Sequence, residues 1–227
     1  VPVLLEESQS YSIGGAGNLA LNIQSINGSV ALHGSVGQDK EGIAFELANA
    51  LNLAINNSKG SYLARMDSDD ISSYERIEKQ YLFMEKNNVD ICGSNSLIIN
   101  EENQIIDTFI APKKQNLIIP YLVSFVPFFH GSVMIKKSFI EKNSLNYSQV
   151  SKAEDKTLWI SFYKYGAKFS NLDEFLYYYR ENQGSLINTN FKKIIKEIKI
   201  TNKKFVKDNL SIILSEFLEN LNKYKKY

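Results

Sequence analysis

The stretch Tyr62-Leu63-Ala64-Arg65-Met66-Asp67-Ser68-Asp69-Asp70 decides the class of this chain. Its first five residues predict a short strand that runs directly into the acidic ones. Neighbouring carboxylates repel one another unless a cation or hydrogen bonds neutralise them, and ligands of open α/β sheets bind beyond the strand ends. Carboxylate oxygens suit Mg²⁺ or Mn²⁺, which can also hold a diphosphate. The stretch therefore predicts either a metal site or a polar turn with incidental charge.

The segments on either side of this stretch predict alternating helices and strands. Upstream, Ile43 to Asn57 has the apolar spacing of a helix. Downstream, Ser72 and Glu75 form a capping-box pattern at the start of a second helix. The apolar face of that helix is predicted to hold Tyr74, Ile77, Tyr81 and Met84. Further strands are predicted at 89–93 with an extension over 96–99, at 133–135 and at 175–179, and a further helix at 154–165.

Composition and charge are those of an ordinary globular protein. Hydrophobic residues make up 44% and charged residues 22%, and a net charge of +1 gives no bulk attraction to nucleic acid. The single cysteine, Cys92, excludes an internal disulfide, and its apolar neighbours predict a buried thiol. No segment reaches the roughly 20 apolar residues of a membrane span, and the N-terminus shows neither a signal-peptide pattern nor an initiator Met. We therefore expect a cytoplasmic, processed or excised chain.

Three further segments carry residues that suit chemistry, and each also has a structural interpretation. Glu154 and Asp155 begin a predicted helix, where a carboxylate is either a simple N-terminal cap or a general base for an acceptor hydroxyl. His130 precedes a predicted strand, where it is either structural or a contact for a metal or a phosphate. Arg180 ends an aromatic strand and suits either a surface ion pair or a diphosphate.

Taken together in one order, these segments resemble the middle of bacterial family-2 glycosyltransferases. The likeness runs from about residue 42 to 185. The motifs that carry it are Ala50–Asn52, Gly60–Asp70, Arg76–Gln80, Gly93-Ser94, His130–Ile135, Ala153–Asp155 and Leu176–Arg180. The resemblance implies an α/β fold of the GT-A type, with a truncated mixed sheet, flanking helices and additional C-terminal helices.

The resemblance also implies a reaction and a role for each candidate residue. The contacts to a nucleotide-diphosphate sugar would be Asp67, Arg65, Arg180 and His130. The ligands of Mg²⁺ or Mn²⁺ would be Asp69 and Asp70. Asp155, beside Glu154, would deprotonate a hydroxyl of a saccharide or lipid-linked saccharide acceptor. The sugar would be transferred with inversion, as a step in bacterial surface polysaccharide synthesis.

The first part of the chain has a different likeness. Gly14–Ile23 and Val36–Gly42 are similar to the start of ribokinase-type sugar kinases, above all the kinase half of the bifunctional enzyme that makes ADP-heptose. By that resemblance, sugar hydroxyls would be contacted by Gly14, Gly15 and Asn18. Neither the first, nucleotide-binding half of a family-2 transferase nor the ATP site of a sugar kinase is recognisable. We therefore interpret 1–41 as a kinase-like fragment fused to a transferase-like domain at 42–190.

The remaining segments leave alternatives open. Residues 191–227 are basic and predict helices, either packed on the domain or forming an amphipathic surface for a membrane or a partner. Residues 101–126 carry no pattern that predicts the donor sugar or the acceptor. Two alternatives to an active transferase are a non-catalytic remnant that still binds metal and a fragment of a heptose-phosphate kinase.

Overall fold

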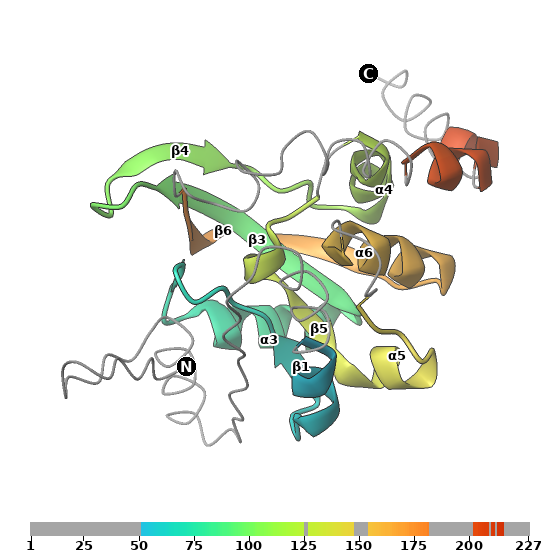
Figure 1. Ribbon diagram of the computed structural model, residues 1–227, viewed down its shortest axis with the longest axis horizontal. Coiled ribbons are helices and arrows are strands. Elements are labelled where there is room, and N and C mark those ends of the chain that lie inside the picture. The colour runs from blue at the N-terminus through green and yellow to red at the C-terminus, as the bar shows by residue number, and fades with distance from the viewer. Residues whose placement is uncertain are drawn as a thin grey trace, which may run out of the picture.

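The computed structural model describes residues 51–124, 127–147, 154–181, 202–208, 210–211 and 213–215. In this part of the chain a six-stranded sheet has the order β1-β5-β3-β6-β2, with β4 also paired to β3 (Figure 1). The strands are β1 (Tyr62–Ala64), β2 (Ile71–Ser72), β3 (Ile91–Ile99), β4 (Ile105–Phe109), β5 (Met134–Lys136) and β6 (Phe169–Arg180).

The two long strands β3 and β6 form the centre of the sheet. They run parallel, from the pair Ile91 and Phe169 to the pair Ile99 and Arg180, with register shifts around Asn95. All other strand pairs of the described residues are antiparallel. On its other edge β3 pairs first with β5 and then with β4. The mixed sheet confirms the predicted α/β class.

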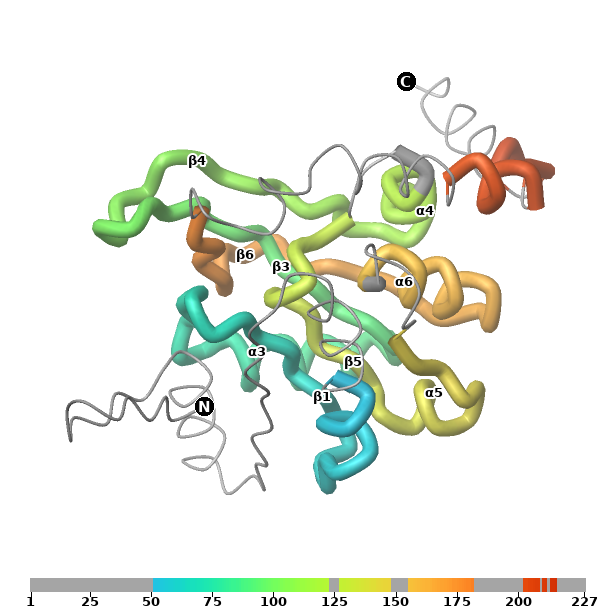
Figure 2. The backbone as a smooth tube through the Cα atoms, in the orientation of Figure 1, coloured from blue at the N-terminus to red at the C-terminus, as the bar shows by residue number. Residues whose placement is uncertain are grey.

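Helices cover both faces of this sheet (Figure 2). They are α3 (Arg76–Asn87), α4 (Gln115–Ser124), α5 (Lys137–Lys142) and α6 (Glu154–Lys164), with the short 3₁₀ helix η1 at His130–Ser132. Successive strand residues face opposite sides, so that Ile91 and Ile135 pack with α4 and α6, whereas Cys92 and Met134 pack with α3. Cys92 is fully buried, as predicted.

Helix α3 departs from the prediction in two ways. It begins at Arg76, its N-cap Glu75 makes no side-chain capping bond, and Ser72 lies in β2, so the capping-box prediction is wrong. The predicted apolar face is also wrong in part, because Tyr74 is 77% and Tyr81 44% exposed. The buried side of α3 instead holds Arg76 and Gln80, which are fully buried, together with Ile77 and Met84.

The other predicted elements are largely confirmed. The strands at 62–66, 89–99, 133–135 and 175–179 correspond to β1, β3, β5 and β6, and the helix at 154–165 corresponds to α6. Residues 51–57 are helical, and so are 202–208, while most of 191–227 and all of 1–50 lie outside the described residues. That part includes Gly14, Gly15 and Asn18, whose sugar contacts stay a prediction. Residues 101–126, which carried no readable pattern, contain β4 and α4. None of the described helices is both long and apolar enough to cross a bilayer.

Candidate active site

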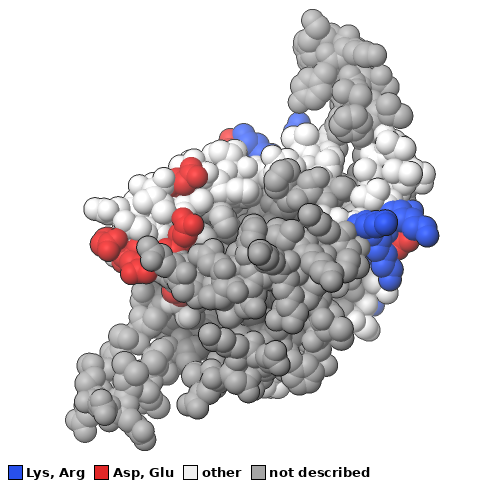
Figure 3. All heavy atoms as spheres, turned by 45° about the horizontal axis from the view of Figure 1, so that its top comes forward, with Lys and Arg blue, Asp and Glu red and all other residues white. Residues whose placement is uncertain are grey.

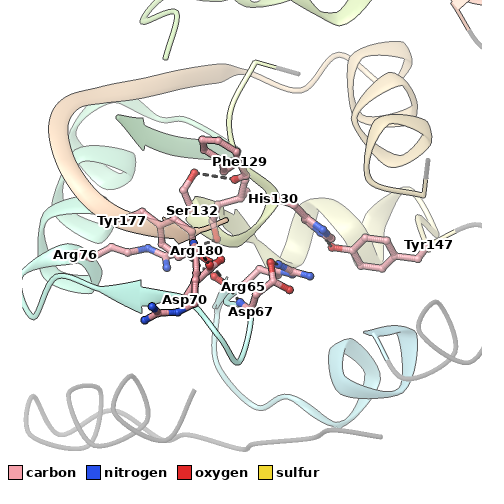
Figure 4. Close-up of polar contacts among 11 residues, drawn as sticks. Arg65, Asp67, Asp70, Arg76, Phe129, His130, Ser132, Tyr147, Tyr177 and Arg180 are labelled. Carbon is pink, nitrogen blue, oxygen red and sulfur yellow. Dashed lines mark hydrogen bonds and ion pairs between the residues drawn. The ribbon is translucent and has the colours of Figure 1, made fainter. Parts of the chain in front are cut away.

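The three aspartates lie on the loop between β1 and β2, which we call the acidic loop (residues 67–70). Strand β1 pairs with β5, and the Arg65 amide still donates to Val133 O at 3.0 Å before the chain turns away from the sheet. The carboxylates therefore follow directly on the end of a strand, as the sequence predicts. In Figure 4, Arg65, Asp67, Asp70, Tyr177 and Arg180 gather around this loop.

Asp67 pairs with Arg65 two residues earlier. The Arg65 guanidinium forms an ion pair with the Asp67 carboxylate, and the two side chains are 13% and 38% exposed. Burial alone would lower the pKa of Arg65, but the negative charge of Asp67 and the hydrogen bond to it, with smaller contributions from Tyr147 and Tyr177, together outweigh burial and raise that pKa. Arg65 therefore stays charged, and part of the Asp67 side chain is open to solvent.

Asp70, in contrast, points into the protein. It is 2% exposed and accepts hydrogen bonds from the Tyr177 hydroxyl and, at 2.7 Å, from the Arg180 amide. Burial raises the pKa of Asp70 to about 6, although both hydrogen bonds work in the opposite direction. The side chain of Asp69 is exposed. The successive residues Asp69 and Asp70 therefore have different environments, because Asp69 faces solvent and Asp70 lies inside the protein.

Tyr177 reaches Asp70 only because residue 131 is a glycine. A Cβ atom at Gly131 would lie 1.7 Å from the Tyr177 hydroxyl oxygen. A second glycine, Gly93, is required in the same sense, because its Cβ would lie 2.7 Å from the Cβ of Phe128. Both glycines belong to the family motifs of the sequence, and close packing explains why neither position can carry a side chain.

Sequence reasoning missed the buried support beneath the acidic loop. The Arg76 guanidinium donates to Arg65 O at 2.8 Å, to Val133 O at 3.2 Å and to Gln80 Oε1 at 2.9 Å, and it lies over the Tyr177 ring. Gln80 in turn donates to Cys92 O and Ser132 O at 3.0 and 2.9 Å. Burial lowers the pKa of Arg76 to about 10. The available signal was the spacing of two hydrogen-bonding side chains one helical turn apart.

His130 lies at the start of η1. One ring nitrogen, Nε2, is 2.7 Å from the Tyr147 hydroxyl, and the Trp159 ring packs edge-on against the imidazole. Burial and the nearby charge of Arg65 lower the pKa of His130 well below its usual value. The imidazole is therefore neutral at physiological pH, which suits a hydrogen-bonding role rather than a positive charge for a phosphate.

Asp155 lies in the first turn of α6, and the Lys156 amide donates to its Oδ1 at 2.6 Å. Burial raises the pKa of Asp155, while that amide and the charges of Arg65 and Lys156 partly offset the increase. Arg65 therefore acts electrostatically on Asp155 and His130 and also pairs with Asp67. The structure thus places Arg65 where it pairs with Asp67 and its charge reaches His130 and Asp155. The side chain of Glu154 lies outside the described residues.

Arg180, the last residue of β6, contacts the acidic loop. Its guanidinium donates to backbone oxygens of Asp69, Asn100 and Glu101 at 2.7, 2.8 and 3.3 Å and to the side-chain oxygen of Asn103 at 2.6 Å. The predicted contact of Arg180 to a diphosphate stays a prediction.

The acidic loop fits a hard divalent cation in a particular way. No cluster of three or more His, Cys, Asp or Glu side chains converges within the described residues. An ion such as Mg²⁺ is often bound by one or two carboxylates together with substrate phosphates and water. Asp69 faces solvent, and the Asp70 carboxylate has lone pairs beyond its two hydrogen bonds. The residues present therefore suit an ion whose coordination is completed by a bound diphosphate.

Comparison with known sequences gives the same family as the sequence motifs. Residues 42–142 match the family described as "Glycosyl transferase family 2". The O-antigen biosynthesis glycosyltransferase WbnJ of Escherichia coli is 36% identical over 139 residues, 60% of this chain and 53% of WbnJ. The Escherichia coli UDP-Glc:alpha-D-GlcNAc-diphosphoundecaprenol beta-1,3-glucosyltransferase WfgD is 31% identical over 65% of this chain and 56% of its own length.

Among solved structures, Staphylococcus aureus TarS (residues 1–349, in complex with UDP) has a TM-score of 0.50 at 15% identity, covering 74% of this chain and 51% of TarS. This likeness supports the GT-A type of fold. The chain spans about half the length of the curated relatives it matches. The match at 42–142 contains the acidic loop and η1, so this part of the chain is similar to glycosyl transferase family 2.

Proposed function

We propose that the chain transfers a sugar from a nucleoside-diphosphate donor to a saccharide acceptor, with inversion at the anomeric carbon. The observation that carries this proposal is the arrangement around Arg65, which pairs with Asp67 of the acidic loop and acts on Asp155 of α6. In this proposal Asp67 serves the donor, and Asp155, which lies on a different element, serves the acceptor.

On the donor side, Asp67 and Arg65 would contact the nucleotide sugar. Asp67 keeps part of its carboxylate exposed for hydroxyl groups of the donor, while Arg65 fixes its orientation. Asp69 and the more deeply buried Asp70 would hold Mg²⁺ or Mn²⁺. When bound, the ion neutralises the charge of the departing diphosphate. His130, neutral and bonded to Tyr147, would offer a hydrogen bond to a substrate.

On the acceptor side, Asp155 would act as the general base. The acceptor hydroxyl loses its proton to the Asp155 carboxylate, and its oxygen forms the new bond to the anomeric carbon. The bond from that carbon to the phosphate oxygen breaks, and the nucleoside diphosphate leaves with the electron pair. Burial raises the pKa of Asp155 toward the operating pH, which increases its strength as a base.

The relatives suggest the class of substrates. WfgD is named for UDP-Glc and a diphosphoundecaprenol-linked acceptor, and WbnJ for O-antigen biosynthesis. We therefore propose a UDP-sugar donor, a lipid-linked saccharide acceptor and a place in bacterial surface polysaccharide synthesis. A cytoplasmic location, with the C-terminal basic residues near the membrane, is part of the same proposal.

The test is a transfer assay with the full chain, UDP-sugars, Mn²⁺ and lipid-linked saccharides, read as release of UDP. Asp155→Asn is expected to lower turnover by about 10²-fold or more, because it removes the base, while UDP binding measured by calorimetry is unchanged. Asp173→Asn is the matched control, since that carboxylate is 57% exposed and pairs with Lys113 at the surface.

The outcomes separate the open alternatives. Binding of UDP with Mn²⁺ but no transfer with any acceptor would indicate a non-catalytic remnant. Absence of any binding of UDP or GDP in the presence of Mn²⁺ would overturn the proposal. Full turnover of Asp155→Asn would remove Asp155 from the mechanism and leave the donor assignment standing.

A further inference from the structure

Arg180 connects two segments that are far apart in the sequence. Its Nε donates to Asp69 O at 2.7 Å, while Nη1 donates to Asn100 O at 2.8 Å and Nη2 to Asn103 Oδ1 at 2.6 Å. Its own amide donates to Asp70 Oδ1 at 2.7 Å. The residue therefore holds two successive residues of the acidic loop, and its guanidinium bridges from them to the turn between β3 and β4.

That turn, residues 100–104, is itself firmly built. The Asn100 side-chain oxygen accepts from the amides of Glu102 and Gln104 at 3.1 and 2.8 Å, and its backbone amide donates to Gln104 O at 3.0 Å. Asn103 has a φ of 64°, in the left-handed region that Asn tolerates better than most residues. The turn thus presents its oxygens to Arg180 in a fixed arrangement.

The surroundings of Arg180 indicate that its guanidinium is used by oxygens of the protein and does not form an open site for an anion. Four of its five guanidinium N–H groups are accounted for by the four oxygens it contacts. Glu101, Glu102 and Asp107 of the β3–β4 hairpin are exposed, and acidic side chains gather at one end of the face in Figure 3. A diphosphate approaching this end would meet negative charge.

We propose that Arg180 is a positioning residue, which fixes the backbone of the acidic loop against the β3–β4 turn so that Asp69 is held where a metal-bound diphosphate needs it. The proposal rests on the proposed function for the identity of the ligand, though not for the contact between the loop and the turn. It replaces the predicted direct contact between Arg180 and the donor.

A lysine at position 180 distinguishes the positioning role from a direct contact between Arg180 and the diphosphate. A lysine keeps the charge and would still attract a diphosphate, but it cannot reproduce the planar fork that joins three backbone oxygens and Asn103. Asn103→Gly gives a second, independent variant: glycine accepts the left-handed backbone, so the change removes only the side-chain oxygen that Arg180 uses. It changes no charge and touches no residue of the acidic loop.

The experiment measures Arg180→Lys, Arg180→Gln and Asn103→Gly in the full chain, with thermal unfolding as the control for global stability. Amide hydrogen exchange of the peptide covering residues 66–72 reports on the loop without any ligand. Calorimetry with UDP and Mn²⁺ reports on the site. We expect faster exchange in all three variants, with Arg180→Lys close to Arg180→Gln, and UDP binding about tenfold weaker or more for both arginine variants and weakened to a smaller degree for Asn103→Gly.

Two results would overturn the proposal. One is unchanged exchange of the 66–72 peptide in Arg180→Gln. The other is a pattern in which Arg180→Lys and Asn103→Gly bind UDP as the wild type does and only Arg180→Gln is impaired, which would indicate a direct electrostatic contact. If the wild-type chain does not bind UDP with Mn²⁺ at all, the proposed function fails, and the exchange data still decide whether Arg180 positions the loop.

Discussion

The acidic loop and the β3–β4 hairpin meet at Arg180, yet they are held in opposite ways. The loop rests on side chains that are almost completely buried, namely Asp70, Arg76 and Tyr177. In the hairpin, β4 pairs with β3 along one edge, and its Ile105 and Ile106 are 59% and 51% exposed. A loop whose geometry depends on buried polar partners tolerates little change, whereas the exposed strand β4 of the hairpin tolerates much.

This difference indicates which region fixes the geometry of the acidic loop and which region tolerates substitution. Tyr177 of β6 bonds to Asp70 of the acidic loop, and Arg76 of α3 joins Arg65, two residues before the loop, to Val133, the residue after η1. One substitution there therefore disturbs several elements at once. The hairpin turn is stabilised by bonds within residues 100–104 and by Arg180. Four substitutions, ordered by the size of the expected effect, test whether the two regions are as separate as their contacts suggest.

The largest effect is expected for Gly131→Ala. The added Cβ would lie 1.7 Å from the Tyr177 hydroxyl, so either Tyr177 leaves Asp70 or η1 moves. We expect a loss of more than about 3 kcal/mol in the free energy of unfolding, together with loss of transfer. Urea unfolding followed by circular dichroism measures it.

Gly166→Ala is the control for that variant. Its Cβ meets nothing within 4 Å, and only the φ of 78° opposes a side chain, so a cost of about 1 kcal/mol is expected. Equal losses for the two glycine variants would mean that Tyr177 is not packed against Gly131 as described.

The same buried contacts mark the limit of what the sequence predicts. Strands β1 and β5 and helix α6 follow from local apolar patterns, and so does the position of the acidic loop at a strand end. Arg76 and Gln80 were missed because helical periodicity assigns polar residues to solvent. Their acceptors include Arg65 O and Val133 O, which are 11 and 57 residues away from Arg76.

The hairpin side was missed for another reason. Strand β4 does not alternate between buried and exposed residues, because four of its five residues are exposed. Helix α4 contains Pro120, which lacks the backbone donor of a helix interior and so argues against a helix there. In both places a long-range contact, to β3 or to α6, stabilises what the local sequence does not specify.

The second prediction removes the support beneath the loop. Arg76→Met leaves Arg65 O, Val133 O and Gln80 Oε1 without this donor. We expect a loss of about 2–3 kcal/mol in unfolding free energy, because buried acceptors lose their hydrogen bonds. Arg76→Met combined with Gln80→Leu should cost less than the sum of the two single variants, since the pair is then replaced by apolar groups. Additive losses would show that the two side chains do not act as one network.

The third prediction concerns the pH dependence of transfer. In the proposed reaction Asp155 acts when deprotonated, so turnover should fall as the pH drops through its raised pKa, which lies above the usual value for an aspartate. Arg65→Met removes a positive charge that lowers this pKa, so the acidic limb of the profile should move to higher pH. Lys79→Met, which removes a lysine that pairs with Glu75 and Glu174 elsewhere, should leave the limb in place. If the acidic limb does not move in Arg65→Met, the charge of Arg65 does not influence the pKa of Asp155.

The smallest effect is expected on the hairpin, for Ile106→Thr. The side chain is 51% exposed, and threonine keeps the β-branched shape that suits a strand, so the free energy of unfolding should change by less than about 0.5 kcal/mol. Binding of UDP with Mn²⁺ should equal that of the wild type, because the turn of the hairpin and Arg180 join it to the acidic loop. A clear loss of UDP affinity in this variant would mean that β4 transmits strain to the acidic loop, and the two regions would then have to be treated as one unit.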